Sequence, residues 1–326
     1  MLGILALCVA AGAGAVAWWL QAPLALKASR VEVSIEPGTG VREVARLWVS
    51  AGVDTSAWAL YQWFRWSGQA RLIRAGSYEV EPGVTPRALL ARMVRGDESL
   101  QTVRLIEGWN FRQVRAALAQ APQLRPTLAG LTDAQVAQLL GLPGERVDGW
   151  LFPDTYAYSR GVSDVTVLRR AQAAMTRQLA EAWAQRLPAS VLRSPTELLI
   201  LASVVEKETG SAADRGRVAG VFHNRLRLGM PLQSDPTVIY GMGERFDGNL
   251  RRADLLADTP WNSYTRRGLP PTPIAMPGRD ALRAAARPEA TPALYFVARG
   301  DGSSVFSATL DDHNRAVNQF QRGAGR

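Results

Sequence analysis

The chain has 326 residues, of which 47% are hydrophobic and 21% charged, as is typical of a folded rather than a disordered protein. A single cysteine, Cys8, excludes an internal disulfide and a cysteine-based metal site, and two histidines leave little for a histidine-based one. The formal net charge of +9 favours an anionic neighbour such as nucleic acid, acidic lipid or cell wall, and charge alone does not choose among these.

The N-terminus of the chain is apolar. No residue between Leu2 and Leu26 is charged. A helix rises ~1.5 Å per residue, so about 20 residues cross the roughly 30 Å hydrocarbon core of a bilayer. We therefore expect residues 1–26 to form a transmembrane anchor, with the aromatic pair Trp18 and Trp19 at the membrane interface.

Two observations leave alternatives to this anchor. Residues 15–17, Ala-Val-Ala, are small enough for the cleavage site of a secretory signal peptide. No Lys or Arg precedes the apolar stretch, whereas Lys27 and Arg30 follow it, so the positive-inside rule does not favour export of the rest of the chain. In either case we expect the body of the protein to lie close to a membrane.

The region after the apolar stretch predicts a small domain. Apolar and polar residues alternate over 31–35, which predicts a half-buried strand. Apolar periodicity from residue 41 and again over 56–68 predicts two helices, and a second strand follows around Tyr78. We expect residues 27–98 to fold as a βααβ domain.

A weak internal repeat runs through the first half of the chain. Each copy reads as a strand, a Glu-(Pro)-Gly turn and an amphipathic helix, and the three copies are VSIEPGTGVREVARLW, YEVEPGVTPRALLARM and VRLIEGWNFRQVRAAL. In the second copy Thr85 has the position of an N-cap and Pro86 that of the first helical residue. Glu36, Glu81 and Glu107 fall at the three turns, and we interpret them as turn residues.

From Asp148 onward the sequence no longer follows the strand, turn and helix repeat of the first half. The stretch GWLFPDTYAYSRG is rich in aromatic residues, and a helix is expected over roughly residues 163–186. Ser194, Pro195 and Glu197 then have the form of a capping box, which marks the start of a further helix. We expect residues 99–326 to form a larger mixed α/β domain, which makes the whole an α+β protein.

That further helix ends on an unusual residue. Its segment 198–205 is wholly apolar or small, so the helix should be buried on most sides, yet Glu206 follows at once. A buried carboxylate is costly unless it is paired or protonated. Either Glu206 forms an ion pair with Arg215, Arg217 or Arg225, or it is a proton donor with a raised pKa.

A second glutamate follows two positions later. Successive helical residues are ~100° apart, so Glu206 and Glu208 diverge by about 200°. We expect Glu206 to point inward, beside the small residues Ala202 and Ser203, and Glu208 to point outward. Raising the pKa of Glu206 by two units would correspond to ~2.7 kcal/mol, the setting of a general acid.

Further polar residues could line a binding site. Asn224 lies off the apolar stripe of the next helix, and a dense polar loop with Gln233 and Asp235 follows. Asn262 and Tyr264 begin a proline-rich segment. Amide, hydroxyl and aromatic groups with one or two carboxylates are typical of a glycan-binding groove. Neither histidine is expected to be catalytic.

These motifs together resemble one family. The chain is similar to the endolytic murein transglycosylases, the MltG or YceG-like family, in GWLFPDTYAY, ASVVEKETG, VAGVFHNRL, LQSDPTVIYG, NSYTRRGLPPTPIAMPG and ALYFVARGDGSSVFSATLDDHN. The resemblance runs from roughly Arg30 to Val317, and its motifs are dense only after residue 148. It implies that the βααβ domain is LysM-like and that 99–326 is a catalytic domain with a buried helix carrying the catalytic glutamate.

The resemblance also assigns roles to residues. It implies that Glu206 is the catalytic residue and that no metal or other cofactor takes part. With weaker support than for Glu206, the resemblance also implies that five residues bind the substrate in a groove: Asn224, Gln233, Asp235, Asn262 and Tyr264.

The implied reaction is cleavage of the MurNAc-β-1,4-GlcNAc bond within nascent peptidoglycan strands, which leaves 1,6-anhydro-MurNAc ends and terminates elongation. The implied partners are peptidoglycan strands, the membrane through the N-terminal helix and peptidoglycan synthases, with no nucleic acid. The implied location is the bacterial inner (cytoplasmic) membrane, single-pass, with the catalytic domain on the periplasmic or extracytoplasmic side. Fewer than about ten residues link the apolar stretch to the first strand, a reach of at most roughly 35 Å, which favours strands near the membrane.

Three other functions stay open on the residues alone. A lysozyme-type hydrolase would need Asp235 or Glu208 as its second carboxylate and would release reducing ends. A non-catalytic cell-wall-binding scaffold would tolerate Glu206→Gln. A nucleic-acid binder would explain the net charge, but no basic cluster interleaved with aromatic residues accompanies it.

Overall fold

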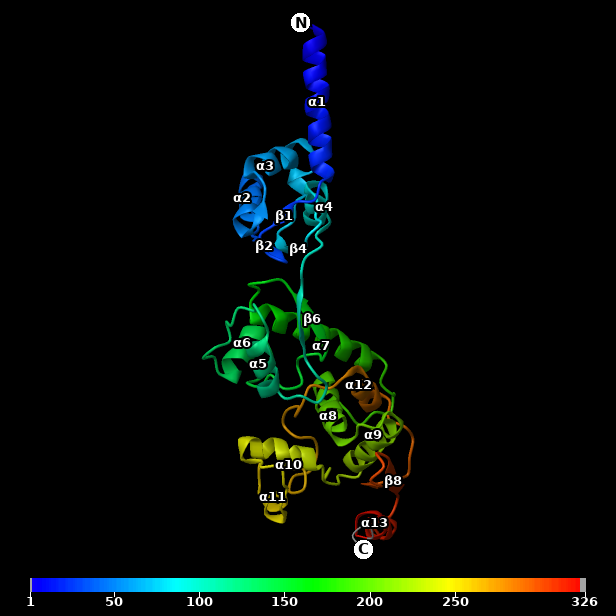
Figure 1. Cartoon of the computed structure of the whole chain (residues 1–326). Helices are drawn as coiled ribbons and strands as arrows, with labels where there is room; N and C mark the ends of the chain where they lie inside the picture. The colour runs from blue at the N-terminus through cyan, green and yellow to red at the C-terminus, as the bar shows by residue number, and fades with distance from the viewer. Residues whose placement is uncertain (1, 323–326) are drawn as a thin grey trace. The chain divides into compact units, whose positions relative to one another are not determined.

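A computed structural model of the chain describes residues 2–322 (Figure 1). These residues form two compact units. The first comprises the described residues up to Thr102 together with 122–124 and 157–162, and the second comprises the remainder. The expected domain limits stay predictions; the two units differ from them because the N-terminal helix belongs to the first unit, to which two short later segments also return.

The apolar N-terminal stretch forms helix α1, Leu2–Gln21. This helix contacts α4, and its Trp19 packs against the core of the first unit. Within residues 2–322, no helix is both long enough and apolar enough to cross a membrane, so the expected anchor is not confirmed.

The first unit contains the expected order of strand, helix, helix and strand, which confirms that prediction. Its main elements are β2 (Val31–Ile35), α2 (Val41–Ala51), α3 (Ala57–Trp66), β4 (Gly76–Val80) and α4 (Pro86–Arg95). Short pieces lie between or before them: β1 (Ala25–Leu26), β3 (Val53–Asp54) and the 3-10 turn η1 (Ala70–Leu72).

The core of this unit lies between its sheet and its helices. Strands β2 and β4 pair antiparallel, with Val33 opposite Tyr78. Residues of β2 alternate between buried and half-buried, as the sequence pattern predicts. Trp48 of α2 is fully buried and donates its indole N–H to the sulfur of Met93 in α4 at 3.2 Å. The two helices thus close over one face of a two-stranded sheet.

The repeat read from the sequence is confirmed as three strand–turn–helix segments. In the second copy Thr85 caps α4 by accepting the N–H of Ala88 at 3.1 Å, and Pro86 is the first helical residue. The third copy consists of β5 (Gln101–Arg104) and α5 (Phe111–Gln120).

The remainder of the chain is mostly helical. Its longer helices are α6 (Asp133–Leu140), α7 (Asp164–Ala184), α8 (Pro195–Glu208), α9 (Ala212–Arg227), α10 (Asp235–Met242), α12 (Arg279–Ala286) and α13 (Leu310–Val317). The strands are β6 (Thr155–Tyr158), β7 (Tyr295–Ala298) and β8 (Ser304–Ser307), and the shorter turns are η2 (Gly243–Arg245), α11 (Arg252–Leu256) and η3 (Asn318–Arg322). Strand β5 pairs with β6 and β7 with β8, so the described chain is a mixed α/β protein with small two-stranded sheets.

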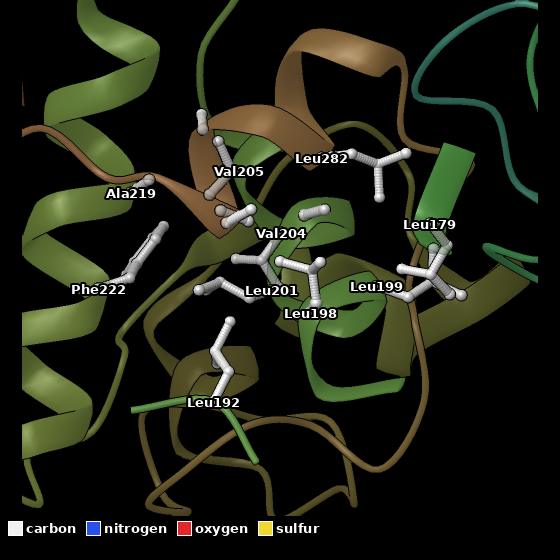
Figure 2. Packing of buried hydrophobic residues seen from close by; sticks show 14 of the residues in the cluster. Leu179, Leu192, Leu198, Leu199, Leu201, Val204, Val205, Ala219, Phe222 and Leu282 are labelled. Carbon is white, nitrogen blue, oxygen red and sulfur yellow. The ribbon is translucent and has the colours of Figure 1, made fainter. Parts of the chain in front are cut away.

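Helix α8 is the centre of the second unit. Every residue from Leu198 to Val205 is buried, as the sequence predicts for a helix without a polar stripe. Helices α7, α9, α10 and α12 all pack against it. Figure 2 shows the apolar side chains of α8 meeting Phe222 of α9 and Leu282 of α12. Because α8 is enclosed on several sides, the core also fixes the position of the residues at its C-terminal end.

Candidate active site

The start of helix α8 is well specified by its sequence. Ser194 accepts the N–H of Glu197 at 3.1 Å, and Pro195 occupies the first helical position, as predicted. The return bond of the expected capping box differs: the carboxylate of Glu197 accepts the N–H of Arg193 at 2.6 Å instead of that of Ser194. Because the start of the helix is fixed and its length is buried, the orientation of its last turn is fixed as well.

Glu206 stands at the end of this buried run and is partly buried. Its Oε2 accepts the N–H of Gly278 at 2.8 Å. Burial raises the pKa of Glu206 above its ordinary value, and the nearby carboxylates Glu107 and Asp280 raise it further. The Gly278 N–H and Arg215 act in the opposite direction. On balance the pKa of Glu206 is raised, so its proton is held more firmly than that of a glutamate in water, as a general acid requires.

None of the three arginines proposed as ion-pair partners holds Glu206. Among the described residues, Arg215 lies 3.6 Å from Asp280 and Arg217 lies 3.0 Å from Glu289. Arg225 donates to backbone carbonyls and to the side chain of Gln233. The ion-pair alternative for Glu206 is therefore wrong.

Two backbone segments, 107–109 and 276–278, enclose the carboxylate of Glu206. They are joined by a hydrogen bond from the Gly108 N–H to the Met276 carbonyl at 2.9 Å and by one from the Met276 N–H to the Trp109 carbonyl at 2.7 Å. A methyl group built on Gly108 would lie 4.0 Å from Cγ of Glu206. Gly108 has a φ of +76°, a conformation that glycine adopts without strain. The turn is thus shaped to approach Glu206 closely.

A cavity of about 700 Å³ is lined by neighbours of Glu206, although Glu206 itself is not part of its lining. Lys207 and Gly108, both next to Glu206, line it together with aromatic and charged residues of other elements, including Arg146, Asp148 and Tyr240. Arg146 lies over the ring of Trp261, 5.0 Å from its centroid. Cavities of this size suit small ligands or a few sugar rings of a longer chain.

Asp148 forms the buried polar wall of the cavity. It accepts the N–H of Phe111 at 2.8 Å and the hydroxyl of Tyr240 at 2.7 Å. Burial raises the pKa of Asp148, and these two hydrogen bonds lower it. The two oxygens of Asp148 thus hydrogen-bond to the start of α5 and to α10. Because both elements line the cavity, Asp148 helps to fix its shape.

Glu208 does not point outward, and that expectation is wrong. Its Oε2 accepts the hydroxyl of Ser234 at 2.6 Å, and burial raises the pKa of Glu208 to about 7. Asp235 adds to the rise, while Ser234 and Arg225 oppose it. The physical reason is that the segment before α10 covers this side of α8, so both flanks of its last turn are enclosed.

Three of the predicted groove residues gather on the Glu208 side. Tyr264 donates its hydroxyl to Asp235 at 2.6 Å. Gln233 has a φ of +51° and accepts a hydrogen bond from Arg225 at 3.0 Å. Their role in substrate binding stays a prediction, because these contacts are all within the protein.

The other two predicted groove residues, Asn224 and Asn262, hold loops in place. Asn224 donates to the carbonyls of Thr291 and Ala293 at 2.8 and 3.0 Å. Asn262 is buried, donates to the carbonyl of Ala257 at 2.7 Å and accepts the N–H of Tyr264 at 2.8 Å. Neither lines the cavity beside Glu206, and their assignment to substrate binding also stays a prediction.

The two histidines make different contacts within the fold. His223 is buried, with its Nε2 at 2.9 Å from the Ala285 carbonyl, and His313 stacks on Tyr295. No group of three or more metal-ligating side chains occurs within the described chain.

Sequence reasoning missed several residues of the cavity. Arg146, Asp148, Lys207 and Tyr240 were not candidates, and Glu107 was interpreted as a turn residue. Lys207 had a signal in the sequence, because it directly follows the candidate acid. The others come from distant segments that only the fold brings together.

The architecture is that of an α+β protein in which the last turn of a buried helix carries Glu206, directly before a residue that lines a cavity. The model of the YceG-like family matches residues 33–319. The chain belongs to the YceG-like family.

Curated relatives and a solved structure are similar over most of the chain. An endolytic murein transglycosylase of Bacillus subtilis is 30% identical, and the match covers 89% of this chain and 84% of that protein. An endolytic murein transglycosylase of Streptococcus pneumoniae is 28% identical, with 88% of this chain and 58% of that protein covered. The crystal structure of a yceG-like protein from Listeria monocytogenes has a TM-score of 0.57 and 26% identity, and covers 88% of this chain and 98% of its own.

Proposed function

We propose that this chain is an endolytic murein transglycosylase that uses Glu206 as its acid and base. The observation that carries the proposal is the position of Glu206: a carboxyl with a raised pKa at the end of a buried helix, next to Lys207 and Gly108, which line a cavity. Membership of the YceG-like family and the names of the relatives support it.

In the proposed reaction the carboxyl of Glu206 protonates the leaving oxygen as the bond from C1 of N-acetylmuramic acid to that oxygen breaks. The C6 hydroxyl oxygen of the same sugar then bonds to C1, and its proton passes to the Glu206 carboxylate. The product carries a 1,6-anhydro end, no water is consumed, and the enzyme recovers its proton. One carboxyl suffices because the nucleophile belongs to the substrate, whereas ordinary glycosidases need two.

The masses of the products test this proposal. The full chain in detergent is incubated with purified glycan strands, and the fragments are analysed by mass spectrometry. We expect internal cleavage with products one water lighter than those of hydrolysis. Reducing ends of full mass would contradict the proposal and favour a hydrolase with a second carboxylate. An absence of cleavage by folded protein on uncrosslinked strands would favour the binding scaffold.

The location at a membrane is part of the proposal. We propose that the first unit faces the outer surface of the cytoplasmic membrane, where nascent strands would be within reach. Besides the uncharged stretch in α1, Trp58 and Trp66 of α3 are 65% and 68% exposed. A cavity of about 290 Å³ lies between α1 and α3, with both tryptophans in its lining. Exposed aromatic groups of this kind favour the membrane interface.

The charge next to these tryptophans supports the same surface. Between Thr55 and Gly76 the chain has no acidic residue and three arginines, Arg65, Arg71 and Arg74. Basic residues beside an apolar surface favour anionic lipids. Association with peptidoglycan synthases is implied by the family resemblance and is included in the proposal on that ground alone.

The double substitution Trp58→Ala and Trp66→Ala is expected to weaken partitioning onto vesicles that contain phosphatidylglycerol by about tenfold or more, because two large apolar side chains no longer enter the interface. Co-sedimentation of the full chain measures this. Leu228→Ala with Leu256→Ala, two exposed residues of the second unit, is the matched control. Equal losses for both pairs would contradict the proposed surface.

A further inference from the structure

Glu107 lies against the same backbone residue that Glu206 binds. The N–H of Gly278 donates to Oε2 of Glu206 at 2.8 Å. A methyl group built on Gly278 would lie 2.0 Å from Oε1 and 2.4 Å from Cδ of Glu107. Both carboxyl groups therefore flank Gly278, and the absence of a side chain there is what admits the carboxylate of Glu107.

The position of Glu107 is fixed by the turn that carries it. Its neighbour Gly108 donates its N–H to Met276, and Trp109 accepts the N–H of Met276, so the turn is joined to the Gly278 segment on both sides of Met276. Glu107 is exposed and forms no ion pair among the described residues. A structural turn residue would need neither this contact with Gly278 nor a negative charge.

We propose that Glu107 is a second carboxylate of the active site, a positioning residue that acts on the reaction through Glu206. The inference rests on the proposed role of Glu206 as the acid. Burial is the main cause of the raised pKa of Glu206, and the negative charge of Glu107 adds to it by disfavouring a second negative charge beside Gly278.

Other charges around Glu206 set the size of this effect. Asp280, at the start of α12, acts in the same direction as Glu107, and Arg215 acts in the opposite direction. Lys207 lies beside the same turn, its Nζ 3.9 Å from the position of a methyl group on Gly108. Because Glu107 is exposed, water and salt screen its interaction with Glu206, so its effect on the pKa of Glu206 should fall as the salt concentration rises.

The test follows the titration of Glu206 directly. Carboxyl carbon-13 NMR of the full chain with labelled glutamate gives the midpoint, and Glu206→Gln assigns the signal by its loss. In Glu107→Gln the titration midpoint of Glu206 is expected at lower pH than in the wild type, and in high salt the difference should shrink. Asp311→Asn, which removes one exposed negative charge from α13, is the control and should leave the midpoint unchanged.

A steric variant tests the same contact without touching Glu107. Gly278 has a φ of −79°, which any residue adopts, so Gly278→Ala adds a methyl group where Glu107 lies. It should displace Glu107 and move the midpoint of Glu206 in the same direction as Glu107→Gln. Glu107→Asp keeps the negative charge on a shorter side chain, so its midpoint for Glu206 should lie between those of Glu107→Gln and the wild type.

Activity gives the second readout. With Glu107→Gln, the alkaline limb of the kcat/KM profile for glycan cleavage should move to lower pH, because Glu206 loses its proton earlier. Unchanged midpoints in both Glu107→Gln and Gly278→Ala would overturn the role of Glu107 even if the wild type cuts glycan. A shifted midpoint in a chain that cuts no glycan would leave Glu107 coupled to Glu206 and overturn the proposed function instead.

Discussion

Glu206→Gln is expected to lower the rate of glycan cleavage by roughly 10³-fold, because an amide can neither donate nor recover the proton of the reaction. Glutamine keeps the shape of the side chain and an oxygen that can accept the Gly278 N–H, so the fold should be preserved. The rate of appearance of new glycan ends, measured by chromatography for both proteins, gives this ratio. Equal melting temperatures would show that the loss is chemical.

The comparison with Glu208→Gln separates one-carboxyl from two-carboxyl chemistry. Glu208 lies on the other flank of α8 and is bonded to Ser234, so it has no part in the proposed reaction. A similar loss of cleavage in a folded Glu208→Gln protein would contradict the one-carboxyl mechanism. Activity retained in Glu206→Gln would contradict the assignment of the acid.

Gly149→Ala is expected to destabilise the second unit by about 3 kcal/mol. Gly149 has a φ of +83°, and an alanine there costs about 1 kcal/mol in backbone strain. The added methyl group would also lie 2.3 Å from Cβ of Pro273, a rigid ring, and overpacking of this kind costs about 1–3 kcal/mol. Urea unfolding followed by circular dichroism measures the loss.

Gly144→Ala is the matched control for this substitution. Gly144 has a φ of +91° and no atom within 4 Å of an added methyl group, so it reports the backbone strain alone. Equal free energies of unfolding for the two variants would show that the segment containing Pro273 moves away at little cost. A larger loss for Gly149→Ala would show that this segment, which continues to Gly278, is held rigidly.

Local structure was largely predictable because its signals are local. The caps at Ser194 and Thr85, the alternation in β2 and the unbroken apolar run of α8 each specify an element within a few residues. Glu206 was found by the same reasoning, since a carboxyl that ends a buried run is conspicuous. The ion pair, left open as the alternative to a proton donor, is wrong: Arg215 and Arg217 face Asp280 and Glu289, and the sequence does not show which side chain an arginine will face.

The surroundings of Glu206 were not predictable from local patterns. Glu107 and Gly278 lie far apart in the sequence, and their contact exists only because two backbone segments are joined at Met276. Helical geometry predicted that Glu206 and Glu208 face different sides, and they do bond different segments, but it could not show that the segment before α10 covers Glu208. Asn224 and Asn262 have amide groups that could bind a ligand. Only the tertiary fold shows that these amides instead donate hydrogen bonds to backbone carbonyls of loops.

Gly278 is also the N-cap of helix α12, and it has no side chain with which to cap that helix. The carboxylate of Glu206 accepts the N–H of Gly278, which is one of the N–H groups that have no partner within the helix. The positive end of the α12 dipole therefore favours the ionised form of Glu206, against the burial that disfavours it. A group that must release a proton in one half of a cycle and regain it in the other works best when neither state is strongly preferred. The same helix packs against α8, so the element that balances the two charge states is held in place by the core that carries the acid.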